Sequence, residues 1–244
     1  MIKFENTSVF NFENAFRGMR NPYNSWDKSD SFIGCGEVGK NGGIYEYPYC
    51  GEYCKDECHF VIGANDLARA QSLVKAGSDH RKFLRQIFVS VDIVAPLYWW
   101  KEFDTYKVGT VANSCSTMHT VHKKEITIDD FSHENLSDKW IDELELVPYN
   151  GEYLNTPLDV LRFIVDALNV YRDSYNQTGD KKYWYDMVQL LPSSYNQRRT
   201  VTLNYEVLRN IRHSDRRNHK LDEWRVGFMG WIDSLPYAKE LLVE

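Results

Sequence analysis

The sequence lacks the features that mark a membrane or secreted protein. It contains no run of about 18 apolar residues, which a membrane-spanning helix requires. Its first residues, MIKFENTSVFNFENAF, have neither the basic nor the apolar segment of a signal peptide. We therefore expect no membrane association and a cytoplasmic location, where the five cysteines are mostly reduced.

An excess of basic residues is also missing. The formal net charge of −6 argues against general nucleic-acid binding, which needs a basic surface, but it leaves room for a local basic pocket. We find no internal repeat, low-complexity tract or flexible linker. The chain has 244 residues, of which 43% are hydrophobic and 14% aromatic, enough for one medium domain with a sizeable core. The sequence predicts a single domain over residues 1–244, with one insert at 32–63.

The insert is rich in glycine and cysteine, unlike the sequence around it. Its four cysteines are Cys35, Cys50, Cys54 and Cys58. Thiolates suit tetrahedral Zn²⁺, so these four residues are candidate ligands of a structural zinc. The Cys-x3-Cys-x3-Cys spacing differs from the usual Cys-x2-Cys arrangement, and ordinary reduced cysteines are the alternative interpretation.

Helical and strand patterns alternate along the rest of the chain. Residues 65–86 are typical of a helix that Asn65 or Asp66 caps, interrupted at Gly77 with a second start near Ser78 or Asp79. Residues 87–98 alternate and are β-branched, which predicts a strand. The clearest amphipathic helix is 156–176, with Thr156 as cap and Pro157 in the first position.

Two polar stretches stand out as candidate binding segments. The first, Pro192 to Glu223, has a β-rich patch, RRTVTLN, followed by a predicted polar helix over about 204–219 and another over 221–233. The second, Pro96 to His119, ends in a run of hydroxyl and amide side chains that suits phosphate or a heteroaromatic ring. The alternative interpretation of that run is a helix start with caps and turns.

The two stretches together resemble the flavin-dependent thymidylate synthases, which methylate dUMP with FAD and a methylene-folate. The family segment L-P-x-x-x-Y/T…T-x-N-x-x-x-L-x-N/H is matched without a gap. The matching residues are Leu191, Pro192, Thr202, Asn204, Leu208, Asn210 and, further on, Glu223. The resemblance covers roughly residues 65–235. It implies an α+β fold with an antiparallel sheet packed with several helices, and a homotetramer whose sites are shared between subunits.

The resemblance also implies roles for individual residues. Asn210 and His219 are expected to contact the flavin, as are Tyr106 and Lys107, and Arg216 is expected to polarise the pyrimidine. The expected substrate-binding residues are Glu102, Asn113, Ser114, Ser116, Arg198 and Arg199. The implied ligands are FAD, a uracil nucleotide such as dUMP, and methylene-tetrahydrofolate.

The chain departs from the family where the family binds anions. Glu102 and Phe103 stand in place of its Gln-Trp pair, and residues 105–107 replace its Arg-His-Arg with Thr-Tyr-Lys. The helix arginine that binds the pyrimidine falls on Asp215, with Arg216 beside it. On a helix one residue is a rotation of about 100°, so Arg216 replaces Asp215 only with a local bulge. The alternative to a flavin-dependent methyltransferase is therefore a non-catalytic nucleotide-binding or protein-interaction module on the same fold.

Overall fold

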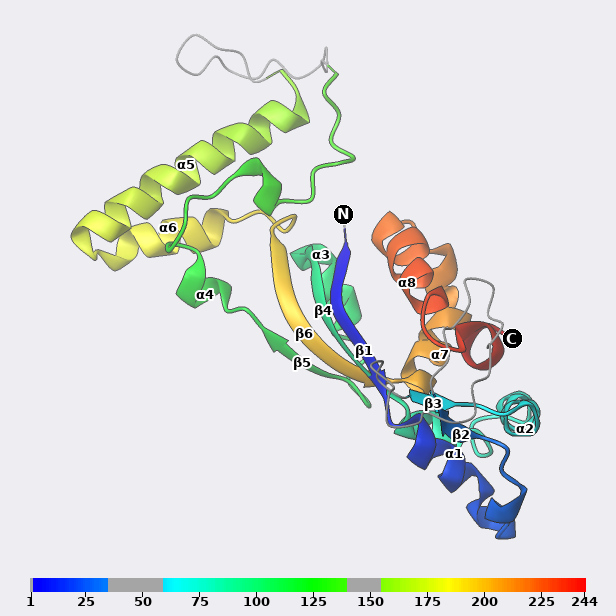
Figure 1. The fold of residues 1–244 in the computed structure, drawn as a ribbon. Coiled ribbons are helices and arrows are strands. Elements are labelled where there is room, and N and C mark those ends of the chain that lie inside the picture. Colours follow the sequence, from blue (N-terminus) through cyan, green and yellow to red (C-terminus); the bar gives the residue numbers. More distant parts are fainter. Residues whose placement is uncertain (1, 35–58, 140–154) are drawn as a thin grey trace. The chain divides into compact units, whose positions relative to one another are not determined.

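The computed structural model describes residues 2–34, 59–139 and 155–244 (Figure 1). They form two compact units. The first unit is Met1–Asn6, Val91–Lys107 and Ala112–Val201, and the second is Thr7–Ser90, Val108–Val111 and Thr202–Glu244. The single-domain expectation stays a prediction. None of the helices described here is long and apolar enough to cross a membrane.

The largest sheet among the described residues has four strands in the order β1-β4-β6-β5. Its strands are β1 (Lys3–Phe10), β4 (Phe88–Pro96), β5 (Val111–Ser114) and β6 (Asn196–Asn204). On β4 and β6, Asp92 bonds to Thr200 and Ser90 to Thr202, so residue numbers rise along one strand and fall along the other. The sheet is antiparallel, and with its helices it confirms the predicted α+β class. Alternate residues of β4 are buried, which explains the period-two pattern in the sequence.

The first unit also contains a helical part. Its elements are α3 (Leu97–Phe103), α4 (Thr117–Thr120), η4 (Ile128–Asp130), α5 (Pro157–Thr178) and α6 (Lys181–Leu190). Thr156 and Asp159 form a reciprocal capping box at the start of α5, and Pro157 takes its first position, as predicted. Gly179 ends the helix with a left-handed φ of 69°, which glycine adopts without steric cost.

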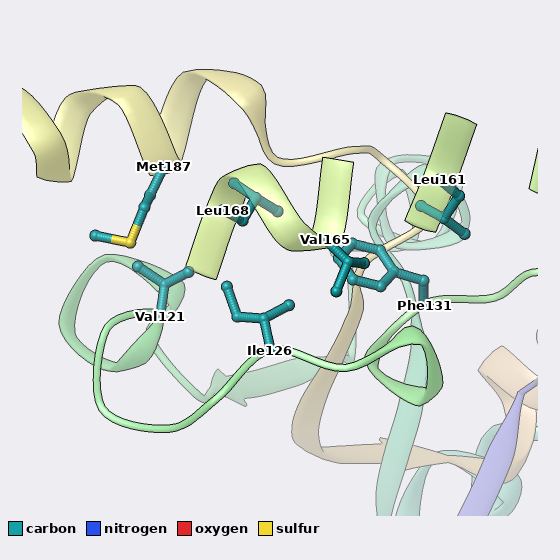
Figure 2. Close-up of a cluster of buried hydrophobic side chains, with 7 residues drawn as sticks. All are labelled: Val121, Ile126, Phe131, Leu161, Val165, Leu168 and Met187. Atoms are coloured by element: carbon teal, nitrogen blue, oxygen red, sulfur yellow. The ribbon is translucent and has the colours of Figure 1, made fainter. Parts of the chain in front are cut away.

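A separate apolar cluster holds this helical part together (Figure 2). Its buried members are Val121, Ile126, Phe131, Leu161, Val165, Leu168 and Met187. The members on α5 recur at spacings of four and three residues, so they share one helix face. Asn169 donates to the Ile126 carbonyl and accepts from the Ile126 amide, which fixes the 121–131 segment against α5.

The second unit is built from short helices and one small hairpin. Before the sheet strand β4 its elements are α1 (Phe12–Arg20), η1 (Asn21–Tyr23), η2 (Trp26–Lys28), β2 (Phe32–Gly34), β3 (His59–Val61), α2 (Ala64–Lys75) and η3 (Lys82–Gln86). After β6 they are α7 (Tyr205–His213), η5 (Asp215–Asn218), η6 (Glu223–Phe228), α8 (Met229–Asp233) and η7 (Lys239–Val243). Strands β2 and β3 pair antiparallel.

The structure corrects the expected helix over 204–219. Helix α7 ends at His213, because Ser214 has an extended backbone with ψ of 177°. The Ser214 side chain then accepts from the Arg216 amide and starts the 3-10 turn η5. A serine that bonds its neighbouring backbone competes with helix continuation. In the sequence analysis, Arg216 could replace Asp215 only through a bulge in a continuous helix. That condition does not apply, because both residues lie beyond the end of α7.

The caps predicted between residues 65 and 86 are also wrong. Gly63 is the N-cap of α2, and the Asp30 carboxylate accepts the amides of Asn65 and Asp66 from outside the helix. The second helical segment, η3, begins after Arg81 rather than after Ser78 or Asp79. A cap supplied by a residue more than thirty positions away leaves no local signal in the sequence.

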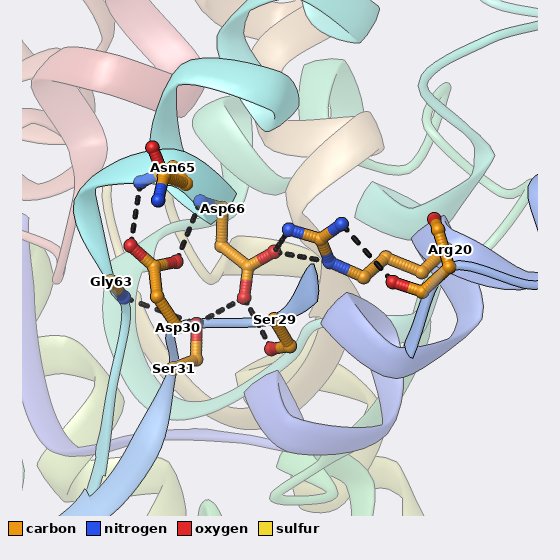
Figure 3. Close-up of polar contacts among 8 residues, drawn as sticks. Arg20, Ser29, Asp30, Ser31, Gly63, Asn65 and Asp66 are labelled. Carbon is orange, nitrogen blue, oxygen red and sulfur yellow. Dashed lines mark hydrogen bonds and ion pairs between the residues drawn. The ribbon is translucent and has the colours of Figure 1, made fainter. Parts of the chain in front are cut away.

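Asp66, free of the capping role, is instead the centre of a buried polar network (Figure 3). Its Oδ1 lies 2.6 Å from the Arg20 guanidinium, while Ser29 and Ser31 donate to its Oδ2 at 2.6 Å. Ser31 also accepts the Gly63 amide, so the network joins α1, the approach to β2, and α2. Burial raises the pKa of Asp66, but hydrogen bonds from Ser29, Ser31 and Arg20 and the arginine charge outweigh it and lower that pKa overall.

Candidate functional site

The residues singled out in the sequence fall into two groups, one in each compact unit. The first unit holds Glu102, Tyr106, Lys107, Asn113, Ser114, Ser116, Arg198 and Arg199. The second unit holds Asn210, Arg216 and His219. Each group is described by itself.

Arg199 is the most firmly held cation of the first group. Its guanidinium carbon lies 4.2 Å from the ring centre of Trp100, a fully buried side chain. Its Nη1 donates to Asp104 at 2.8 Å and its Nε to Gln197 at 2.9 Å. The Trp100 indole N–H is itself fixed on the Gln197 carbonyl. Stacking and hydrogen bonds together hold the planar guanidinium in one orientation.

Arg198 faces the other side of the sheet. Successive side chains of a strand alternate between faces, and the partners of Arg198 are Glu5 at 2.6 Å and Asp92 at 3.6 Å. Hydrogen bonds from Thr200 and Asn6 lower the pKa of Asp92, with a smaller contribution from the Arg198 charge. Asp92, unusual within a strand pattern, is thus accounted for by polar partners. Each arginine stays a predicted ligand contact, but the two guanidinium groups do not converge on one point.

The hydroxyl and amide run begins on the edge strand β5 and ends at the start of helix α4, so the interpretation of the run as a helix start holds in part. Asn113 and Ser114 are exposed on β5, while Ser116 is the N-cap of α4 and its carbonyl accepts from Thr120. The Cys115 amide between them donates to the Arg198 carbonyl at 2.9 Å, which pairs this segment with β6. The run therefore offers exposed donors and acceptors beside the arginine-bearing strand.

The remaining residues of the first group lie on or just after α3. The Glu102 carbonyl accepts from the Thr105 hydroxyl, which closes the end of the helix. The Tyr106 ring lies 6.4 Å from the Phe103 ring, and Lys107 is exposed. This segment, which corresponds to the family's Arg-His-Arg, thus presents one lysine charge.

In the second unit, Asn210 belongs to a polar network that the sequence analysis missed. The buried Glu206 carboxylate accepts from Arg81 at 3.3 Å and from Arg85 at 2.9 Å. Arg81 also donates to the Asn210 side-chain oxygen at 3.2 Å. The four-residue spacing of Glu206 and Asn210 places both on one face of the α-helix α7, while Arg81 precedes the 3-10 helix η3 and Arg85 lies within it. That spacing was visible in the sequence, but the meeting of the two elements was not.

Positive charge accumulates along α7 beyond this network. Arg209 is buried and donates to the Leu241 carbonyl rather than to a carboxylate. Burial lowers the pKa of Arg209, and the nearby Arg81 charge adds to that effect against the opposing Glu206. Burial and the Arg209 charge likewise lower the pKa of His213, whose ring bonds to a backbone carbonyl at 2.9 Å. The charge that opposes Arg209 is that of Glu206, and Arg212 on the same helix is paired with Asp233 at 2.8 Å.

Arg216 and His219 meet at one aromatic ring. The Arg216 guanidinium carbon lies 4.9 Å from the centre of the Trp224 ring, and the His219 ring lies 6.4 Å from it. The His219 Nδ1 accepts the Leu221 amide at 3.1 Å, so the neutral ring carries its proton on Nε2. The pair can therefore present a planar cation and an imidazole N–H donor to a ligand.

The predicted zinc ligands Cys35, Cys50, Cys54 and Cys58 lie outside the residues that the structure describes. Within the described ranges, no group of three or more His, Cys, Asp or Glu side chains could hold a metal ion. Cys115 is described, and it is an exposed free thiol.

Comparisons with known proteins give no match to a family model and none to a curated protein sequence. Solved structures do match. The chain is similar to thymidylate synthase ThyX from Helicobacter pylori, determined with FAD and dUMP, at 16% identity and a TM-score of 0.60, over 99% of this chain and 96% of that one. A second structure of the Helicobacter pylori enzyme, also with FAD and dUMP, gives the same identity and TM-score over 97% of its length. The fold of this chain is therefore that of the flavin-dependent thymidylate synthases.

Proposed function

We propose that the chain is a divergent member of the flavin-dependent thymidylate synthase family that binds FAD and a uracil nucleotide. The observation that carries this proposal is the likeness in fold, which extends over 99% of the chain to an enzyme solved with FAD and dUMP. The matched motif adds support, because its residue Asn204 caps α7 by accepting the Val207 amide at 3.0 Å. The motif thus sets where the helix that carries Asn210 begins.

The described side chains fit a flavin and a nucleotide. Asn210 uses its oxygen to accept from Arg81, and among the described residues its amide nitrogen has no hydrogen-bond partner, so it can donate to a ligand carbonyl. The imidazole N–H of His219 is a second donor, and Arg216 beside it is a planar cation suited to a pyrimidine or a phosphate. FAD, when bound, supplies the redox chemistry, and the chain's residues bind and orient the flavin and the nucleotide.

FAD binding is the first test. Purified protein should absorb near 450 nm, a general property of flavins, or acquire that absorbance when FAD is added. Substitution Asn210→Ala should weaken FAD binding about tenfold, the effect of losing one well-placed hydrogen bond. Asn176→Ala, on α5 in the other unit, is the matched control and should leave FAD binding unchanged. Protein that stays colourless and takes up no FAD would refute the proposal.

Nucleotide binding separates the proposed enzyme from the alternative module. A ligand at 100 times its dissociation constant stabilises the folded state by about 2.7 kcal/mol, so dUMP should raise the unfolding temperature measurably. Arg216→Gln should reduce that rise. Conversion of dUMP to dTMP with methylene-tetrahydrofolate, FAD and a reductant tests the methyltransferase activity directly. Nucleotide stabilisation without FAD binding favours the non-catalytic nucleotide-binding module, and no response to any nucleotide favours a protein-interaction module.

The proposal extends to assembly, location and metal content. A cytoplasmic homotetramer is expected from the family resemblance, and light scattering of the purified protein tests the mass. A metal assay on the same sample tests zinc at the four cysteines of the insert. A monomer would contradict the shared-site architecture, and metal-free protein would contradict the zinc.

A further inference from the structure

The orientation of the Asn210 side chain is set by its neighbour Arg81. The Arg81 Nη2 donates to the Asn210 Oδ1 at 3.2 Å. A guanidinium has only donors, whereas a side-chain amide has an acceptor oxygen and a donor nitrogen. Arg81 therefore keeps the Asn210 oxygen toward itself and leaves the amide NH2 group for another partner. Asn210 is exposed, so a ligand can reach it.

Arg81 is itself held by a buried carboxylate and by its backbone. The Glu206 side chain is 7% exposed and accepts from the Arg81 Nε at 3.3 Å. The Arg81 amide donates to the Gly77 carbonyl at 3.1 Å. Gly77 has a left-handed φ of 109°, which glycine adopts without steric cost, so the turn before η3 fixes where Arg81 begins. Arg81 is thus fixed beside Asn210 before any ligand binds.

Arg85 offers an internal comparison, because it shares the carboxylate but not the amide. Its Nε donates to the other oxygen of Glu206 at 2.9 Å. Its side chain is 53% exposed, and within the described part of the chain it forms no hydrogen bond with Asn210. A role that acts through Asn210 therefore belongs to Arg81 and not to Arg85.

We propose that Arg81 is a positioning residue of the flavin site, which fixes Asn210 as a hydrogen-bond donor. The inference rests on the proposed function, in which Asn210 contacts FAD. The oxidised flavin ring system carries mostly acceptors, its carbonyl oxygens and ring nitrogens, and a single N–H donor. A donor at Asn210 matches these acceptors, whereas an acceptor at the same place would leave both groups without a hydrogen bond, at a cost in binding.

A cycle of FAD dissociation constants tests the positioning role. Arg81→Met should weaken FAD binding about fivefold, because the Asn210 amide is then free to turn. In an Asn210→Ala background the same substitution should change the affinity by less than about twofold, because Arg81 acts through Asn210. Arg81→Lys keeps a donor and should recover part of the loss. Arg85→Met is the matched control, which should change FAD affinity by less than about twofold.

Asn210→Asp tests the hydrogen-bond polarity without removing the partner of Arg81. The carboxylate still accepts from the guanidinium, so the fold is kept, but an acceptor replaces the amide donor. FAD binding should fall at least as far as in Asn210→Ala, about tenfold. Urea unfolding of the flavin-free variants is an independent measurement. There the effects of Arg81→Met and Asn210→Ala should be less than additive, as expected for two residues in contact.

The outcomes separate this inference from the proposed function. If the native protein binds FAD, the proposed function stands. The positioning role is then overturned by native affinity in Asn210→Asp, by an equal effect of Arg81→Met with and without Asn210, or by additive unfolding effects. If the native protein takes up no FAD, the proposed function and the positioning role both fall.

Discussion

Substitution Asp66→Asn should destabilise the second unit strongly. The Arg20 side chain is 5% exposed and that of Asp66 is 0% exposed, and the guanidinium contacts the carboxylate at 2.6 Å. Asparagine has nearly the same shape as aspartate, so the substitution removes the negative charge and leaves the cation buried. Removing one partner of a buried ion pair costs about 3–5 kcal/mol.

Urea denaturation at pH 7 measures this cost as a lower free energy of unfolding. Asp27→Asn, an exposed aspartate of the same loop region, is the matched control and should change stability by less than about 0.5 kcal/mol. The double variant Arg20→Met with Asp66→Asn should be more stable than Asp66→Asn alone, because it removes the unpaired cation. A loss below about 1 kcal/mol for Asp66→Asn, or no recovery in the double variant, would refute the reasoning.

The same substitution has a pH signature. The pKa of Asp66 lies below its ordinary 3.8 in the folded state, so the unfolded chain binds the proton first. The stabilisation is therefore complete above pH 3.8 and is lost as the pH falls through the lower, folded-state pKa. The difference in unfolding free energy between native protein and Asp66→Asn should be constant near neutrality and shrink only in that acid range.

Three further predictions concern stability at other places. Leu168→Ala, in the apolar cluster of the first unit, should lower the free energy of unfolding in urea by about 2–5 kcal/mol. Val170→Ala, at a residue that is 62% exposed on the same helix, should lower it little, and equal effects of the two substitutions would contradict the cluster. The pKa of His213 is lowered, so unfolding free energy should fall as the pH drops through 6.5, and His213→Asn but not the exposed His119→Asn should remove this fall. Glu206→Gln leaves Arg81 and Arg85 without their carboxylate partner and should lower the free energy of unfolding by roughly 1–3 kcal/mol. An unchanged free energy of unfolding would contradict the network.

Local patterns in the sequence were sufficient to predict two of the regular elements, α5 and β4. Thr156, Pro157 and the apolar stripe predicted α5, because its cap, first residue and buried face all lie within one segment. The β-branched alternation predicted β4 for the same reason. The motif around Asn204 and Asn210 pointed to the fold that the structural comparison supports.

The tertiary structure alone decided how the polar residues are partnered. Nothing local in the sequence shows that Asp30 caps α2, or that Glu206 on α7 binds arginines near η3 more than a hundred positions away. The orientations of Arg198 and Arg199 followed from strand alternation only once β6 was placed in the sheet. By itself the sequence determined α5 and β4, because their capping and periodicity act over a few residues, but it did not determine the end of α7 or the cap of α2. Which charges meet depends on chain segments that only folding brings together, and that is why the site required the structure.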